Sequence, residues 1–163
     1  MFVQAGDLKP EGLQLELHPQ IGPLDYEGGQ EIGVAAAALK ARLIPARGGM
    51  KCAGRFVATA FVPCSRCLEP YALPVDREFD LIYLPGPGEA GPEGMELQIS
   101  RDDLDVAFLD PDGRLDVNNL VAEQIYLSLP MKPLCGEGCR GLCPGCGTNL
   151  NLEACRCEAT ART

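Results

Sequence analysis

Residues 71–83 read Tyr-Ala-Leu-Pro-Val-Asp-Arg-Glu-Phe-Asp-Leu-Ile-Tyr, and this stretch indicates the fold class most directly. Apolar side chains occupy alternate positions, interrupted only by Arg77, and the opposite face carries Asp76, Glu78 and Asp80. A period of two residues is typical of a β-strand with one buried face and one solvated face. The stretch therefore predicts a long strand that covers an apolar core.

Two further extended runs precede this strand. Residues 34–44 and 50–62 are rich in Ala, Val and Phe, and the pair Gly48-Gly49 separates them. Two such runs around a glycine pair predict a tight β-hairpin. Shorter strands are expected at 13–17, 95–99 and 104–109, with a Gly/Pro-rich loop at 18–30 and another at 85–94.

The sequence predicts one main helix. Asp116 is a suitable N-cap, apolar residues recur at helical spacing as far as Leu129, and Pro130 would end the helix. One helix packed against several antiparallel strands predicts an α+β fold, with an antiparallel, β-rich and barrel-like core domain over residues 1–130. Residues 131–163 hold few large apolar side chains, so this segment is expected to be a small module that needs a metal to fold.

Eight of the nine cysteines form four close pairs, which is enough for two four-sulfur metal sites. A structural zinc ion takes four ligands at tetrahedral geometry, usually from two short turns that carry two ligands each. Cys52 stands alone in a strand and is expected to be a buried apolar residue. The predicted ligands are Cys64, Cys67, Cys135, Cys139, Cys143, Cys146, Cys155 and Cys157.

The spacing favours one partition of these ligands and leaves another open. In the favoured partition, Cys64 and Cys67 meet the pair Cys135/Cys139, and the remaining two pairs form a second site in the tail. The alternative joins the two pairs between residues 135 and 146 in one compact site. Zinc, two ions per chain, is the expected cofactor, and iron is the chemical alternative.

A reducing compartment makes metal binding a better interpretation than disulfide bonds. The first residues lack a basic start followed by an apolar run, and no stretch of about 18 apolar residues occurs. We therefore expect a cytoplasmic protein without a membrane partner. Clustered cysteines in such a protein are more often metal ligands than cross-links.

Charge is unevenly distributed along the chain, whose net charge is −9. No acidic residue lies between Ile32 and Leu68, whereas residues 64–130 carry fourteen acidic and four basic groups. If Gly48-Gly49 forms the hairpin turn, Arg42 should lie opposite Arg55. This basic face is either simply solvated or contacts nucleic acid, and its predicted contact residues are Lys40, Arg42, Arg47, Lys51 and Arg55.

Three blocks of sequence resemble the bacterial YceD family: residues 63–70 (PCSRCLEP), 129–135 (LPMKPLC) and 141–151 (GLCPGCGTNLN), followed by Cys155 and Cys157. The resemblance covers about residues 8–158. It implies a non-enzymatic factor in accumulation of large-subunit ribosomal RNA and in maturation of the large ribosomal subunit. The implied partner is precursor ribosomal RNA or a basic large-subunit ribosomal protein.

An enzymatic function is not expected. The sole histidine, His18, stands before Pro19 in a predicted loop, and closed four-sulfur zinc sites have no open position for water activation. No small-molecule substrate is expected. The alternative function is a redox or electron-transfer module that uses iron or the Cys64/Cys67 thiol pair.

Overall fold

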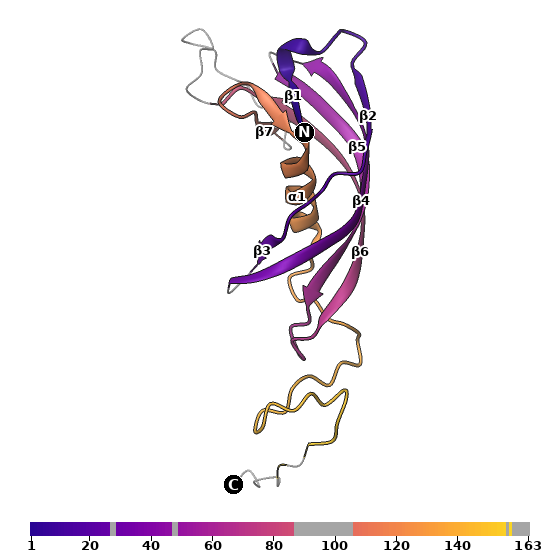
Figure 1. Cartoon of the computed structure of the whole chain (residues 1–163), viewed down its shortest axis with the longest axis vertical. Coiled ribbons are helices and arrows are strands. Elements are labelled where there is room, and N and C mark those ends of the chain that lie inside the picture. Colours follow the sequence, from indigo (N-terminus) through magenta and orange to yellow (C-terminus); the bar gives the residue numbers. More distant parts are fainter. Residues whose placement is uncertain (27–28, 47–48, 87–105, 156, 158–163) are drawn as a thin grey trace.

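A long, curved β-sheet dominates the computed structural model, which describes residues 1–26, 29–46, 49–86, 106–155 and 157. One helix lies on the concave side of the sheet, and the C-terminal segment extends beyond one end of it (Figure 1). The elements in chain order are β1 (Phe2–Gln4), the 3-10 turn η1 (Ala5–Asp7), β2 (Leu13–Leu17), β3 (Leu24–Tyr26), β4 (Gln30–Ala46), β5 (Gly49–Pro63), β6 (Pro70–Leu84), β7 (Val106–Phe108), β8 (Arg114–Asp116) and α1 (Val117–Ser128).

The main sheet has the strand order β2-β4-β5-β6-β7, and β3 pairs with the first residues of β4. All pairs are antiparallel except β6 and β7, which are parallel. The strand-rich, one-helix fold that the sequence predicts is confirmed, but the barrel-like closure is wrong. Within the described residues the sheet stays open, with β2 and β7 at its edges, and α1 covers its concave side (Figure 1).

A β-bulge in β4 explains why its sequence lacks a single alternation. The register against β5 shifts between Ala35 and Ala38, and Ala36 has a positive φ of 53°. An extra residue exchanges the two faces of a strand. The buried positions are therefore Ile32 before the bulge and Leu39 after it, which differ in parity.

The core forms between the concave face of the sheet and α1. Phe56 of β5 and Leu39 of β4 are fully buried, and they belong to one apolar cluster with the helix. The helix residues in this cluster are Val117, Leu120, Val121 and Ile125. The helix begins as predicted, because the Asp116 side chain accepts a hydrogen bond of 2.9 Å from the Asn118 amide.

The expected register of the long hairpin is wrong by two residues. Ala46 pairs with Gly49, so Lys40 lies opposite Arg55, and Arg42 lies opposite Ala53. Gly49 belongs to β5 and lies against β6, where an added Cβ would be 1.9 Å from the Tyr83 carbonyl oxygen. That close approach places this glycine in the strand rather than in the turn.

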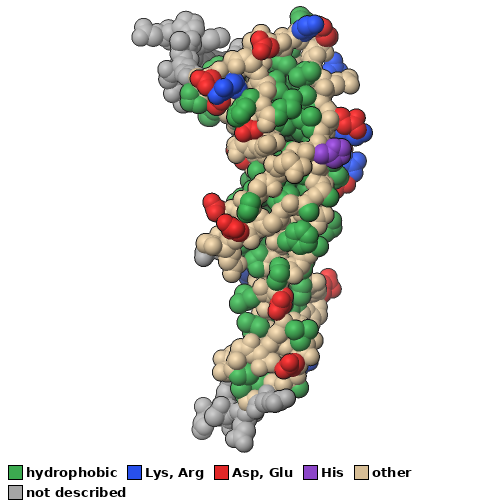
Figure 2. Space-filling model, viewed as in Figure 1, with side chains coloured by type: hydrophobic (Ala, Val, Ile, Leu, Met, Phe, Trp, Pro, Cys, Tyr) green, Lys and Arg blue, Asp and Glu red, His purple; other side chains and the backbone are tan. Residues whose placement is uncertain are grey.

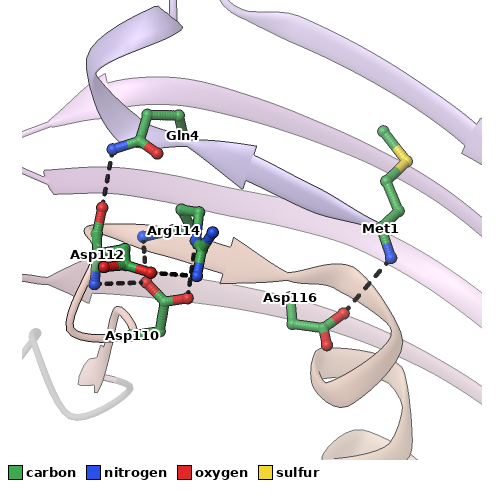
Figure 3. A network of polar contacts seen from close by, with 6 residues as sticks. All are labelled: Met1, Gln4, Asp110, Asp112, Arg114 and Asp116. Carbon is green, nitrogen blue, oxygen red and sulfur yellow. Dashed lines mark hydrogen bonds and ion pairs between the residues drawn. The ribbon is translucent and has the colours of Figure 1, made fainter.

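A two-stranded sheet of β1 and β8 joins the start of the chain to the start of α1, and the sequence analysis missed it. The Gln4 side chain donates to the Asp112 carbonyl oxygen, and Asp110 and Asp112 both bind Arg114 (Figure 3). The Met1 amino group lies 3.6 Å from Asp116. These strands are too short, at three residues each, to show a period in the sequence.

The predicted strand at 104–109 is found in part as β7, whereas the predicted strand at 95–99 lies outside the described residues. The loop predicted at 85–94 lies outside them from residue 87 onward. Among the described residues, no helix is long and apolar enough to cross a membrane.

Candidate metal centres

The fold brings the eight paired cysteines into two groups of four. In each group all four sulfur atoms lie within 4.8 Å of one another. One group is Cys64, Cys67, Cys135 and Cys139, and the other is Cys143, Cys146, Cys155 and Cys157. This is the partition favoured by the sequence, and the compact alternative is not the one that forms.

The first group joins the β5–β6 turn to the segment that follows α1. The Sγ atoms of Cys64 and Cys139 are 3.7 Å apart, and those of Cys67 and Cys135 are 3.8 Å apart. Four thiolates about 2.3 Å from a tetrahedral zinc ion would lie about 3.8 Å from one another. These two sulfur–sulfur distances therefore match the spacing of a four-thiolate zinc site.

Arg66, which lies between Cys64 and Cys67 in the sequence, forms hydrogen bonds that connect the C-terminal segment to the sheet. Its guanidinium donates to the carbonyl oxygens of Cys139 at 3.0 Å and Glu137 at 3.4 Å, and its own carbonyl accepts from the Leu142 amide. Gly141, with a φ of 72°, allows this approach, because a Cβ there would lie 3.0 Å from the Arg66 carbonyl oxygen. The first group and the hydrogen bonds around it thus connect residues far apart in the sequence.

The second group forms within the tail itself. A turn closed by the Gly147 amide on the Cys143 carbonyl presents Cys143 and Cys146, and the chain then returns to present the other pair. The Sγ atoms of Cys146 and Cys155 are 3.7 Å apart, and those of Cys143 and Cys157 are 4.0 Å apart. Those of Cys143 and Cys155 are 3.0 Å apart, so this group would have to open slightly around a zinc ion. This group is more exposed than the first, in which three of the four ligands are buried.

The charges within each group show why it suits a cation. Although burial opposes it, hydrogen bonds from the backbone lower the pKa of Cys64 to about 6, and the Thr148 hydroxyl and amide lower that of Cys146 to about 6. The neighbouring sulfurs raise the pKa of Cys135, and likewise of Cys157, to about 12. Four thiolates in contact repel one another, and a bound divalent cation removes that repulsion.

The donor sets also limit the chemistry. Four sulfur ligands complete a tetrahedral shell, so a zinc ion there would be structural and would have no free position for a substrate. Cys52, as expected, is buried in the main core and belongs to neither group. His18 is exposed at the edge of the molecule (Figure 2).

Four of the five predicted nucleic-acid residues, Lys40, Arg42, Lys51 and Arg55, lie on the face of the sheet opposite the core, the convex face, together with acidic residues. Arg42 donates to the Glu11 carbonyl oxygen at 3.2 Å, and Arg47 lies outside the described residues. Asp76 and Asp80, on the acidic face of β6, share this surface. The ion pairs are Lys40–Glu16 at 2.8 Å, Lys51–Asp80 at 2.8 Å and Arg55–Asp76 at 2.5 Å.

The structure adds residues that the sequence analysis did not select. Arg66 stands out only through its place between two ligands, and Tyr83 looks like an ordinary member of the strand pattern in residues 71–83. Arg66 contacts the tail and Tyr83 lines a pocket with residues of α1, and no local sequence pattern shows contacts between such distant segments.

Residues 52–162 match the family model described as large ribosomal RNA subunit accumulation protein YceD. The chain belongs to the YceD family. The match includes both cysteine groups, β6 and α1.

The relatives of this YceD chain include a chloroplastic maize protein named as a large ribosomal RNA subunit accumulation protein YCED homolog 1. It is 26% identical over 132 residues, which cover 69% of this chain and 45% of the maize protein. An uncharacterized Mycobacterium tuberculosis protein is 26% identical over 145 residues, which cover 87% of this chain and 66% of that protein. The chain thus spans less than half of the maize relative. No solved structure gives a significant match.

Proposed function

We propose that this chain is a non-enzymatic, zinc-binding factor for accumulation of large-subunit ribosomal RNA, and that it works in the cytoplasm as an adaptor in assembly of the large ribosomal subunit. Membership of the YceD family supports the ribosomal role. The observation that carries the adaptor role is the pair of four-cysteine groups, which suit a structural metal, and of which the first connects the tail to the sheet.

Zinc, with two ions per chain, is the metal that the donor sets favour. All-sulfur tetrahedral sites take zinc most often, and the first group already has the required spacing. Residues 131–163 would then be a module that depends on metal for its fold, attached to a core domain of residues 1–130.

The distribution of charge favours a basic ribosomal protein as the partner. Three cations of the convex face have a carboxylate within ion-pair distance, so their attraction for phosphate is reduced. The net charge of −9 also attracts a basic protein and repels RNA. Precursor ribosomal RNA is the alternative partner, through Lys40, Arg42, Arg47, Lys51 and Arg55.

A salt titration distinguishes these two partners. The triple variant Lys40→Ala, Arg42→Ala and Arg55→Ala is compared with a control that loses equal charge elsewhere, Lys9→Ala, Arg77→Ala and Lys132→Ala. If RNA binds the convex face, the first variant loses retention of precursor ribosomal RNA and its salt dependence becomes shallower, while the control does not. If the partner is instead a basic ribosomal protein, as we prefer, both variants and the wild type should retain precursor ribosomal RNA equally weakly.

The ribosomal role is tested by depletion of the protein in its own host. We expect the ratio of large-subunit to small-subunit ribosomal RNA to fall, and the wild-type chain to restore it. A ratio that does not change on depletion would reject the proposal. The redox alternative predicts either coloured, iron-containing protein or metal-free, titratable thiols at Cys64 and Cys67, whereas zinc thiolate is colourless and leaves neither thiol free.

A further inference from the structure

A small pocket lies between β7, β8 and the first two turns of α1, away from both cysteine groups. Its volume is about 250 Å³. The network of Figure 3 forms one side of it, where Asp110, Arg114 and Asp116 lie. Tyr83 of β6 and the helix residues Asn119 and Glu123 also line the pocket.

The Tyr83 hydroxyl has an unusual position in this pocket. Tyr83 is only 3% exposed, and its hydroxyl has no hydrogen-bond partner within the part of the chain that the structure describes. A buried tyrosine hydroxyl normally finds such a partner, because leaving it unpaired costs free energy. A ligand that enters the pocket would supply the partner that the described residues do not.

The charges around the hydroxyl identify the kind of group that fits. Burial, and then the Glu123 carboxylate, raise the pKa of Tyr83, so the phenol stays neutral and lies near a negative charge. Within the described residues, Asn119 is the only donor to the Glu123 carboxylate, at 2.7 Å on one of its two oxygens. The pocket is therefore lined by a neutral hydroxyl, which can donate or accept, and by a carboxylate with an oxygen to which no described residue donates.

The other charged groups on the pocket are already paired. Arg114 binds Asp110 and Asp112, and Asp116 caps α1 and lies near the Met1 amine. An anion such as phosphate would meet Glu123 without an available cation. A ligand with several N–H donors and a positive charge would satisfy Tyr83 and Glu123 together.

We propose that this pocket binds a basic side chain, an arginine or a lysine, of the protein that the chain holds during assembly. The inference rests on the proposed function, because it specifies how a basic ribosomal protein would be recognised. The cation lies between the Glu123 carboxylate and the Tyr83 hydroxyl, and the narrow pocket accepts one side chain.

Binding is tested on the purified full-length chain with a short capped peptide that contains a single arginine, and with the same peptide carrying neutral citrulline. Amide chemical shifts of residues around the pocket report occupancy. We expect the arginine peptide to shift signals from β7 and the start of α1, and the citrulline peptide to bind about tenfold more weakly.

Two variants locate the site. Tyr83→Phe removes only the hydroxyl and should weaken arginine-peptide binding about fivefold to tenfold, and Glu123→Gln should weaken it by a similar factor. Tyr126→Phe, at an exposed position on the same helix, is the matched control and should have no effect. Without peptide, Tyr83→Phe should also raise the melting temperature, because it removes an unpaired buried hydroxyl.

Equal binding of the two peptides, or equal arginine-peptide binding by Glu123→Gln and the wild type, would overturn the inference. This result is distinguishable from failure of the proposed function. If the peptide does not bind but depletion still lowers large-subunit ribosomal RNA, only the pocket is wrong. If the peptide binds and depletion has no effect, the ribosomal role is wrong.

Discussion

Asn151 donates a hydrogen bond from Nδ2 to the Cys139 Sγ at 3.3 Å, and so links the two cysteine groups. Cys139 belongs to the first group, whereas Asn151 lies in the loop between Cys146 and Cys155 of the second. The Asn151 Oδ1 accepts from the Arg140 amide at 2.8 Å, which fixes the orientation of the side chain. The second group, by holding this loop in place, therefore supports a ligand of the first.

Replacing Asn151 with Ala should weaken metal binding at the first group, although no ligand is changed. Groups that orient a ligand commonly account for 10-fold to 100-fold of metal affinity, and we expect a loss of about tenfold. Competition with a chromophoric chelator measures it. Gln20→Ala, at an exposed position in the loop after β2, is the control, and an affinity unchanged by Asn151→Ala would show that the two groups are independent.

Replacing Arg66 with Ala should loosen the tail from the sheet. The substitution removes two hydrogen bonds to backbone carbonyls, and because Arg66 is exposed we expect a loss of about 1–2 kcal/mol in the free energy of attachment. Limited proteolysis should then cut near residues 131–134 sooner than in the wild type. Arg77→Ala removes an exposed arginine from the middle of β6 and should leave the cleavage rate unchanged.

The elements that could be predicted are those with strong local signals. The period of residues 71–83 gave β6, and the Asp116 cap with Pro130 gave α1 nearly to the residue. The grouping of the cysteines could be predicted as well, because the pairs are closely spaced and one of them follows a strand while another follows the helix.

The elements that could not be predicted depend on long-range contacts. Barrel closure is decided by whether β2 and β7 meet, and the helix on the concave face occupies the space between the two sides of the sheet. The hairpin register depends on the close approach of Gly49 to Tyr83 of a third strand. The ion pairs of the convex face come from the pairing of β4 with β2 and of β5 with β6, and no local pattern in the sequence shows those pairings.

Replacing Gly54 with Ala should destabilise the sheet. A Cβ at this position would lie 2.3 Å from the Lys40 carbonyl oxygen and 2.7 Å from the Ala41 Cα, both backbone atoms of the paired strand. We expect the free energy of unfolding to fall by about 1–3 kcal/mol, measured by denaturant titration. Gly22→Ala, where the added Cβ would meet nothing within 4 Å, is the control, and equal stability of the two variants would contradict the close packing of β4 on β5.

The thiol of Cys52 should be the least reactive of the nine. Burial, and then the nearby Asp80, raise its pKa to about 12, and the thiol lies inside the main apolar core. The thiols of Cys135 and Cys157 also have a raised pKa, but they are exposed and therefore accessible to the reagent. After chelation of the metal, eight cysteines should be alkylated at pH 7, and Cys52 only after unfolding. Mass spectrometry of the digested protein assigns the sites, and early alkylation of Cys52 would show that the core around it opens.

The most direct test of the account is the metal content of three forms of the chain, purified under reducing conditions without added metal. We predict two zinc ions in the wild type and one in each of two variants, Cys64→Ser with Cys67→Ser and Cys155→Ser with Cys157→Ser. Because each variant leaves one group of four sulfurs intact, the remaining ion is assigned to that group. One zinc ion in the wild type, or iron in place of zinc, would contradict two closed zinc centres, one between the sheet and the tail and one within the tail.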